Sequence, residues 1–570
     1  MITPTGSRNS RHRRLSRFTF VAGVLALTAS CTAGSTTGGS TAASAPPPAG
    51  PAGSATSAGS AGPTDTGPAA TVSAGAPSGS GSSVATGGGI APSDGGGSSP
   101  GPSGSGPALS IGFILEPVSL DFTQSGGAQS PQVLLTNVYE TLVKLDQKSN
   151  IVPGLASAYQ VSPDGKTYTF TLRSGVTFTN GAPFTAADAK FSIDRVKTAW
   201  KVAIKAQMDV VASTAAVSPT QLQVTLKQPS NSWLFAMTGR IGAMFSRTGV
   251  AALATTPVGT GPYLLKTWNR GDSIVLTRNP RYWGPAPALG QATFKYFRDG
   301  TAMDNALLTG GIQVVSTEQS PESLGQFKDP KYQIITGATD GEVMMTMNDG
   351  KPPLNDVRVR QAINYALDKK AILDGAWSGY GTVIGSHESP NDPWFVDEAN
   401  RYPHDVGKAK ELLAAAGQSN LTLSLKVPPP GYATAIAPIV ISELAEAGIT
   451  VKAISVTWPI WLDRVFDKAD YQLTIINHVE PRDIATLWAN PQYYTRYDNP
   501  AVTKLLTDGD AGSQASYVAD YRKAVQLLAD DAAAAWLFSF PNLVVADADV
   551  KGLPTNAVGE SFVVADLSVG

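Results

Sequence analysis

The stretch 162–196, SPDGKTYTFTLRSGVTFTNGAPFTAADAKFSIDRV, constrains the fold of this chain more than any other. Asp164-Gly165 is a tight-turn pair, because glycine takes a positive φ without a Cβ clash. Residues 167–172 alternate threonine with tyrosine, phenylalanine or leucine, and this period of two predicts a half-buried strand. Asn180-Gly181 is a second turn signal. The stretch therefore begins as strand, turn, short strand and turn.

A helix is predicted to follow the second turn. Thr185 is a candidate N-cap, and Asp188 lies three residues on, near the positive end of the helix. Ala189, Ile193 and Val196 recur at i, i+4 and i+7, which indicates one apolar stripe. The stretch is thus an α/β building block, with no chemically reactive residue expected in it.

Other motifs follow in a specific order along the chain. They are NVYETLV at 137–143, PGLAS at 153–157, GTGPY at 259–263, NPRYWG at 279–284 and DVRVRQAINYALDKK at 356–370. Together with the stretch 162–196, they resemble the extracellular solute-binding proteins of family 5. These are receptors that deliver peptides, nickel and related solutes to ABC importers. The resemblance runs from Ala108 to near Val550.

The resemblance implies an α/β, two-lobed fold of the periplasmic-binding-protein type (type II, large peptide-binding subgroup). A hinge of two strands would join the lobes, and the ligand would lie in the cleft between them. Lobe one would comprise 108–296 and the return segment 537–570, and lobe two would comprise 297–536. We expect the first crossing near Phe294–Arg298 and the return near Trp536–Phe540.

The N-terminal part predicts export and anchoring. Residues 1–31 combine a basic start with an apolar run of 13 residues, Phe18–Ser30, and so are typical of a signal peptide. The run ends at Cys31, the chain's sole cysteine, in a context that resembles a bacterial lipobox, so we expect lipidation there. The alternative is an ordinary signal peptide with an incidental cysteine. Arg13-Arg14 leaves the choice between Sec and twin-arginine export open.

Residues 32–107 are rich in Gly, Ser, Ala, Pro and Thr and carry only Asp65 and Asp94 as charges. Such a segment cannot form a core, and as a flexible coil it would span roughly 50 Å. It is predicted to be a disordered tether. The expected location is extracytoplasmic, on the outer face of the bacterial cell membrane (periplasm or cell-wall space).

Composition excludes several functions. The 43 basic and 45 acidic residues nearly balance, so no nucleic-acid partner is expected. Three histidines, His387, His404 and His478, are scattered without metal-ligand spacing, so neither a metal nor a cofactor is expected. The part predicted to fold contains no cysteine and no histidine in a nucleophile motif. An enzyme such as a cell-wall peptide hydrolase is therefore not expected.

The candidate ligand contacts lie where the strand before His478 runs into a polar turn, NHVEPRD. Peptide-binding relatives have an acid at the matching strand end, which pairs with the peptide's α-ammonium. The resemblance makes Glu480 the first candidate for this acid and Asp483 the second, with His478 and Arg482 beside them. A buried cation needs a charged partner. The alternative is that Glu480, Arg482 and Asp483 pair with one another on a surface turn.

Aromatic side chains are the other candidates. Trp458 is the preferred candidate to face the cleft, while for Trp461 packing in the core is at least as good an interpretation as a place in the cleft. The segments 230–233 and 241–247 are candidate opposing walls in lobe one. Dipeptide-binding relatives have an arginine for the ligand carboxylate in the segment that matches 427–432, VPPPGY, which has no base here.

The leading prediction is a lipid-anchored receptor that captures peptides and hands them to ABC permease subunits. The missing base favours a longer peptide or another solute over a dipeptide. The alternatives within the same fold are a nickel–chelator complex, haem, an opine or an oligosaccharide. A binding module that signals or scavenges without transport also stays open.

Overall fold

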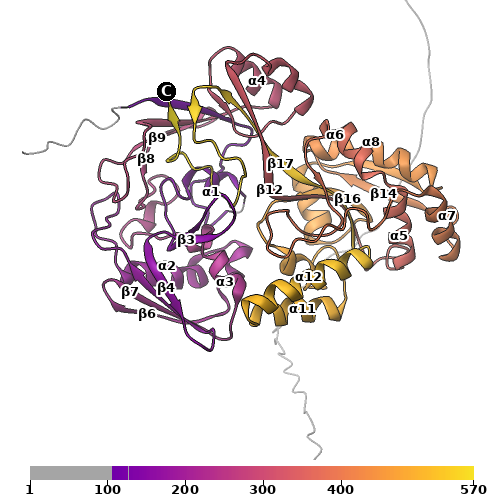
Figure 1. Ribbon diagram of the computed structural model, residues 1–570, viewed down its shortest axis with the longest axis horizontal. Helices are drawn as coiled ribbons and strands as arrows, with labels where there is room; N and C mark the ends of the chain where they lie inside the picture. Colours follow the sequence, from indigo (N-terminus) through magenta and orange to yellow (C-terminus); the bar gives the residue numbers. More distant parts are fainter. Residues whose placement is uncertain (1–105, 126) are drawn as a thin grey trace, which may run out of the picture. The chain divides into compact units, whose positions relative to one another are not determined.

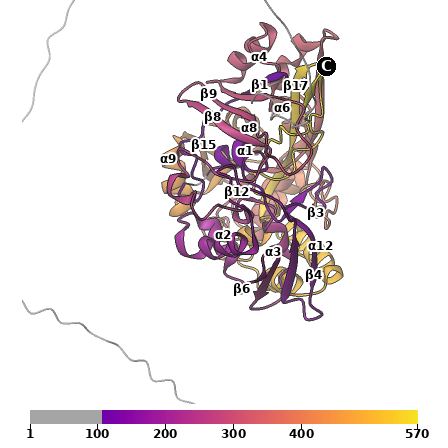
Figure 2. The same ribbon diagram turned by 90° about the vertical axis from the view of Figure 1, so that its left-hand side faces the viewer.

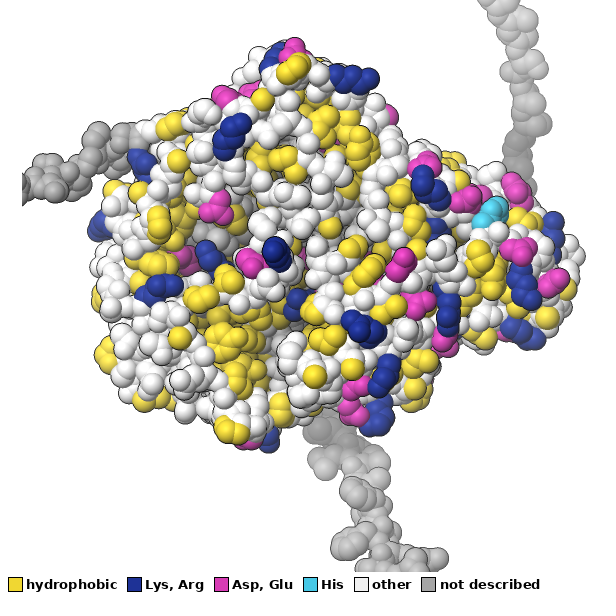
Figure 3. All heavy atoms as spheres, in the orientation of Figure 1, with side chains coloured by type: hydrophobic (Ala, Val, Ile, Leu, Met, Phe, Trp, Pro, Cys, Tyr) yellow, Lys and Arg dark blue, Asp and Glu magenta, His cyan; other side chains and the backbone are white. Residues whose placement is uncertain are grey.

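The structure is a computed structural model that describes residues 106–125 and 127–570. The predicted signal peptide, Cys31 and most of the tether lie outside the described residues. Within the described part, no helix has the length and apolar character needed to cross a membrane. On the face shown in Figure 3, acidic and basic side chains are interspersed, in keeping with the near balance of charge.

An 11-stranded mixed sheet runs through the described residues. Its strands, in spatial order, are β15 (Thr450–Ser455), β14 (Thr422–Val427), β16 (Leu473–His478), β12 (Tyr332–Met347), β17 (Ala534–Asp547), β11 (Val314–Val315), β1 (Ala108–Phe113), β10 (Gln291–Tyr296), β9 (Ser273–Arg278) and β8 (Tyr263–Asn269), and β13 (Thr382–Val383) pairs with β17. A separate four-stranded sheet has the order β4 (Ala156–Val161), β5 (Thr167–Leu172), β7 (Gln221–Leu226) and β6 (Val211–Ser218). Two short pairs complete the strands: β2 (Val143–Leu145) with β3 (Ile151–Pro153), and β18 (Val550–Lys551) with β19 (Ser568–Val569).

Helices lie in both halves of the described part of the chain (Figure 1). With β1 to β11 lie α1 (Gln129–Leu134), α2 (Ala186–Ala199), α3 (Asn231–Ala236) and α4 (Gly300–Leu308). With β12 to β16 lie α5 (Val357–Ala366), α6 (Lys369–Trp377), α7 (Val406–Ala415), α8 (Gly431–Glu446), α9 (Trp458–Trp461), α10 (Ile484–Trp488), α11 (Pro500–Ala511) and α12 (Gln514–Asp530). A π-helical segment, Leu462–Asp467, continues α9.

Two main groups of buried residues define two lobes. Lobe one surrounds the core built on β1, β5, β7, β9, β10 and α2. Lobe two surrounds one core on β12, β14 and β16 and another on the opposite face of β12 and β16. Along β12, Val343, Met345 and Met347 point into one core and Met344 into the other. This alternation is the period of two expected for a strand that is buried on both faces.

The two longest strands of the sheet, β12 and β17, pass from one lobe to the other and lie side by side (Figure 1, Figure 2). Their pairing shifts register between Ala338 and Glu342. Phe294, at the start of the predicted first crossing, is fully buried in the core of lobe one. We therefore propose that the first crossing lies between Ala338 and Glu342; the lobe boundaries stay a prediction.

The stretch 162–196 forms the predicted elements. Tyr168, Phe170 and Leu172 of β5 are buried, and Ala189, Ile193 and Val196 of α2 form its buried stripe. Gly165 and Gly181 take the positive φ angles that their turns require, +70° and +88°.

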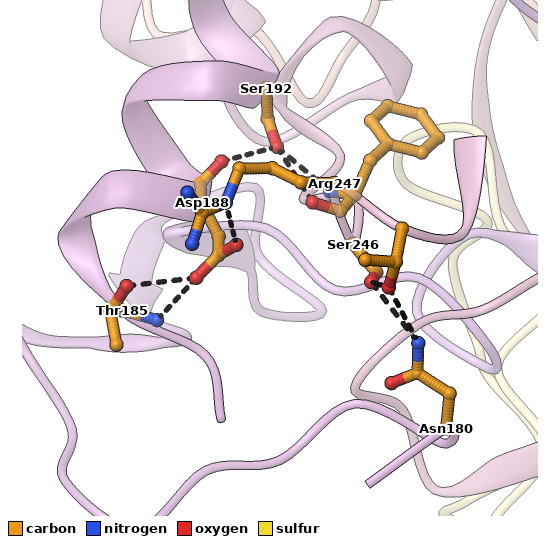
Figure 4. A network of polar contacts seen from close by, with 8 residues as sticks. Asn180, Thr185, Asp188, Ser192, Ser246 and Arg247 are labelled. Carbon is orange, nitrogen blue, oxygen red and sulfur yellow. Dashed lines mark hydrogen bonds and ion pairs between the residues drawn. The ribbon is translucent and has the colours of Figure 1, made fainter. Parts of the chain in front are cut away.

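The N-terminus of α2 is fixed by a small polar network around Asp188 (Figure 4). The Thr185 backbone N–H and hydroxyl donate to Asp188 Oδ2 at 3.0 and 2.8 Å, and Arg247 Nε donates to Asp188 Oδ1 at 2.8 Å. All these contacts lie inside lobe one. The stretch is therefore a structural scaffold.

Candidate functional site

The candidate residues lie where β16 ends and the chain turns into α10. The ligand-capable atoms of His478, Glu480 and Asp483 lie within 4.8 Å of one another. Antiparallel pairing of β12 with β16 sets Glu342 directly opposite His478. Asp483 precedes α10 as its N-cap residue. The structure thus brings three of the predicted residues together and adds an acid from the neighbouring strand.

Asp483 is anchored in the protein. His387, in the segment after β13, lies with Nε2 2.7 Å from Asp483 Oδ1, and His478 Nδ1 lies 3.6 Å from Oδ2. Burial alone would raise the pKa of Asp483, but His387 and His478 hold it below its usual range. Burial lowers the pKa of His387, which favours a neutral ring that donates to the carboxylate. Asp483 is therefore ionised at neutral pH.

Glu480 differs from Asp483 because its side chain reaches solvent. Protein atoms nevertheless surround it closely enough that desolvation, with the nearby Asp483 charge, raises its pKa. None of the described residues forms an ion pair with it within 4.0 Å. Glu480 is thus an accessible acid at a partly desolvated position, which suits it to receive a positive charge.

Arg482 makes its contacts with groups other than Glu480. Its guanidinium carbon lies 3.8 Å from the ring centroid of Phe235 in lobe one and 5.5 Å from that of Trp394 in lobe two. Arg482 Nε is 3.6 Å from Asp392 Oδ1, and Nη2 donates to the Ser149 carbonyl at 3.4 Å. Its backbone takes φ +56°, which a non-glycine residue rarely adopts. Arg482 therefore links the two lobes.

Further polar contacts join the lobes beside this site. Asn231 Nδ2 donates to the carbonyls of Asp510 and Gly512, both at 2.9 Å. The Ser230 hydroxyl and the Ser232 N–H donate to the Asp510 carboxylate, both at 2.7 Å. The predicted wall at 230–233 thus contributes to contact between the lobes. Of the other predicted wall, Ile241, Ala243 and Phe245 are buried in the core of lobe one.

Sequence reasoning missed most of the acids around the site. Asp340, Glu342, Glu388 and Asp392 are all strongly desolvated, and burial raises the pKa of Asp340 to about 6, of Asp392 to about 7 and of Glu388 to about 8. The pKa of Glu342 is also raised by burial. A signal was present for Glu342, an acid in the mostly apolar strand sequence EVMMTM. The site therefore contains more acidic side chains than basic side chains that could pair with them.

Aromatic rings continue from the acids along lobe two. The ring of His478 stacks on Tyr494, whose ring contacts those of Trp461 and Phe466. Trp461 is buried and donates Nε1–H to Thr474 Oγ1 at 3.0 Å. Trp458 stacks on Trp461 at 5.1 Å with 40 % of its surface exposed. Trp458 therefore offers an accessible aromatic face, and its contact with a ligand stays a prediction.

One cavity of lobe two lies elsewhere. Its volume is about 600 Å³, and its lining includes Asp349, Arg360 and Tyr497 but none of the predicted site residues.

In the segment 427–432, the Tyr432 hydroxyl accepts a hydrogen bond from the Asn477 N–H at 3.1 Å, so this segment supports the end of β16.

Comparison with known proteins matches residues 150–483 to the model of the bacterial extracellular solute-binding proteins, family 5 Middle. The nickel-binding periplasmic protein of Escherichia coli (strain K12) is 33% identical over 299 residues, which are 49% of this chain and 56% of that protein. The glutathione-binding protein GsiB of Salmonella typhi is 29% identical over 321 residues, 55% of this chain and 62% of that protein. The chain thus matches less than two thirds of the length of these relatives.

Solved structures are similar over a larger part of the chain. The ABC transporter-associated periplasmic binding protein DppA from Helicobacter pylori, in complex with the peptide STSA, has a TM-score of 0.72 at 24% identity and covers 81% of this chain and 98% of its own. The oligopeptide-binding protein AppA from Bacillus subtilis, in complex with a nonapeptide, has a TM-score of 0.71 at 21% identity and covers 82% and 99%. These neighbours confirm the predicted two-lobed α/β fold.

Proposed function

Because the chain belongs to the bacterial extracellular solute-binding proteins of family 5, as its motifs predicted, we propose that it is the substrate-binding receptor of an ABC importer. It would capture peptides between its two lobes and deliver them to permease subunits in the membrane. Members of this family bind solutes and do not convert them, so the protein is inferred not to be an enzyme. Family membership also supports an extracytoplasmic location.

The observation that carries the peptide proposal is the accessible acid Glu480 beside several buried acids. Asp392 has Arg482 as its partner, and the nearby Arg240 pairs with Glu560. Glu480 is therefore free to receive the α-ammonium of a peptide, and Trp458 could cover an adjoining apolar side chain. Asp483 would act through its charge, because its oxygens already face His387 and His478.

Anchoring through a lipid on Cys31 is part of the proposal. Residues 32–107 would then tether the two lobes to the membrane while leaving them free to reach the permease. The proposed anchor predicts that Cys31→Ser moves the protein from the membrane fraction to the soluble fraction.

The experiment for peptide binding is a thermal-denaturation screen with peptide libraries. A ligand that binds only the folded state raises the midpoint in proportion to RT ln(1 + [L]/Kd). We expect Glu480→Ala to weaken binding of a peptide hit by about 2–5 kcal/mol, since a buried charge loses its partner. Glu411→Ala is the control, because Glu411 is exposed and pairs with Lys408. If no library peptide shifts the midpoint and no peptide co-purifies with the protein, that result would count against peptide binding.

A second candidate is a non-peptide solute in the same site. The absence of a base in 427–432 favours it over a short peptide with a free carboxylate. Solved neighbours include a protein in complex with agropinic acid and another in complex with Ni(L-His). Native mass spectrometry of the purified protein separates the two candidates, since the mass of a bound molecule identifies a peptide or another solute.

A further inference from the structure

A short helix of lobe one, α3, is contacted by two segments of lobe two. Trp233 of α3 is buried in the core of lobe one, whereas Val502 and Leu506 of α11 are buried in a core of lobe two. Polar contacts nevertheless join the start of α3 to the end of α11, as the ribbon view indicates (Figure 1). Phe235, near the end of α3, lies with its ring centroid 3.8 Å from the guanidinium carbon of Arg482. Lobe two therefore contacts α3 at both of its ends.

The contact between α3 and α11 is reciprocal. The first N–H groups and the last carbonyls of an α-helix have no partner inside the helix. Asn231 Nδ2, from α3, donates to the carbonyls of Asp510, in α11, and of Gly512, just beyond it, both at 2.9 Å. In return, the Asp510 carboxylate accepts hydrogen bonds from the Ser232 backbone N–H and the Ser230 hydroxyl, both at 2.7 Å. Each lobe thus supplies partners for helix-end groups of the other lobe.

The position of Asp510 is unfavourable within its own helix. Asp510 lies in the last turn of α11, where the helix dipole disfavours an acid, and that turn contains no basic residue. Asp508, in the same turn, pairs with Lys504 one turn earlier, whereas the Asp510 carboxylate accepts its hydrogen bonds from lobe one. The contact with α3 therefore offsets a cost within α11, and that cost returns when the lobes separate.

We propose that Asp510 and Asn231 form a latch that holds the two lobes in contact before a solute binds. The latch consists of protein atoms alone, so it forms without a solute. Through Phe235, α3 also contacts Arg482, which is two residues from Glu480 in the chain. Asp510 is then a positioning residue: it raises the affinity for a solute through the fraction of molecules whose lobes already touch. This effect on affinity rests on the proposed function, whereas the contact between the lobes does not.

The first experiment measures the separation of the lobes in the full chain without any added solute. A pair of FRET dyes is attached at Lys227→Cys in lobe one and Arg522→Cys in lobe two, both at exposed positions. Cys31→Ser removes the sole native cysteine, so only these two positions are labelled. Because the labels lie in different lobes, loss of the latch should lower the FRET efficiency between them.

Four variants of the labelled chain test the latch. Asp510→Ala and Asn231→Ala should each lower the FRET efficiency, and the double variant should lower it no further than the stronger single change, because both remove the same contact. Asp510→Asn keeps one acceptor oxygen and should give an intermediate value. Asp508→Ala is the control, because Asp508 is exposed and pairs within α11. The latch is refuted if Asp510→Ala and Asn231→Ala leave the efficiency unchanged, or if Asp508→Ala lowers it as much.

The second experiment uses a library peptide that raises the denaturation midpoint. Asp510→Ala should weaken the binding of this peptide about tenfold, mainly through faster dissociation, and Asp508→Ala should leave it unchanged. Equal peptide affinity in Asp510→Ala and the parent chain would refute the effect on affinity. If the FRET changes appear as expected but no peptide binds, the latch stands and the proposed function is contradicted. Peptide binding with unchanged FRET in both latch variants would refute the latch alone.

Discussion

Two aspartates at the start of helices show how differently the two lobes use a carboxylate. Asp188, in the first turn of α2, accepts hydrogen bonds from Thr185 and pairs with Arg247. Asp483, at the start of α10, faces His387 and His478 and has other buried acids around it. The charge of Asp188 is matched by its partners, whereas the acids near Asp483 exceed the bases that face them.

The difference shows where buried acids without matching bases lower the stability of the molecule. A carboxylate whose charge is matched by protein partners stabilises its helix and needs no further partner. An excess of buried acids raises their pKa values and leaves a demand for positive charge, which a ligand or an ion can meet. Lobe one thus presents a carboxylate with its charge matched at α2, while the turn after β16 keeps acids whose charge is not matched.

The largest predicted effect comes from a substitution that increases the excess of acids over bases at the site. Arg482→Ala removes the partner of Asp392 and the contact with Phe235, and it should lower the free energy of unfolding by about 3–5 kcal/mol. Urea unfolding measures the change from the midpoint and the slope. The double change Arg482→Met with Asp392→Asn should recover most of the loss, because it leaves no unpaired buried charge.

Arg496→Ala is the matched control for Arg482. Arg496 also takes φ +56°, but its guanidinium donates only to Gln492 among the contacts found in the described residues. Its replacement should cost less than about 1 kcal/mol. If both substitutions cost the same, the pair with Asp392 does not determine the effect of Arg482→Ala.

These two regions also explain what the sequence could predict. The elements of 162–196 followed from local signals: the partners of Asp188 begin three residues away, and the buried faces of β5 and α2 follow their own periods. The site could be predicted only in part. His478, Glu480 and Asp483 lie five residues apart at most, but Glu342, His387 and Asp392 reach them through strand pairing and loops from about 90 residues or more away.

The acids Glu318 and Asp304 test whether crowded buried acids also lower stability outside the site. Burial and the charge of Asp304 raise the pKa of Glu318 to about 8, well above its ordinary value. The folded state therefore keeps a proton that the unfolded state releases, so this contribution to stability is present at pH 4 and is lost as pH rises through about 8. Glu318→Gln should raise the unfolding free energy by about 2 kcal/mol at pH 8 and change it little at pH 4.

Urea unfolding at the two pH values measures this difference. Glu411→Gln serves as the control, because Glu411 is exposed and its replacement should show no pH-dependent gain. A Glu318→Gln variant that is destabilised equally at both pH values would mean that Glu318 is needed for its hydrogen bonds, such as that from the Ser320 N–H at 2.7 Å.

The smallest predicted effect concerns the matched carboxylate. Asp188→Ala removes the acceptor for Thr185 and the partner of Arg247, and it should cost about 1–2 kcal/mol, the usual range for a lost helix cap. Asp194→Ala is the control in the same helix, because Asp194 forms a half-exposed pair with Lys190 and should cost less than about 0.5 kcal/mol. Neither change should alter ligand binding, because Asp188 and Asp194 contact only lobe one. A loss of binding in Asp188→Ala at full folding would show that the scaffold and the site are coupled.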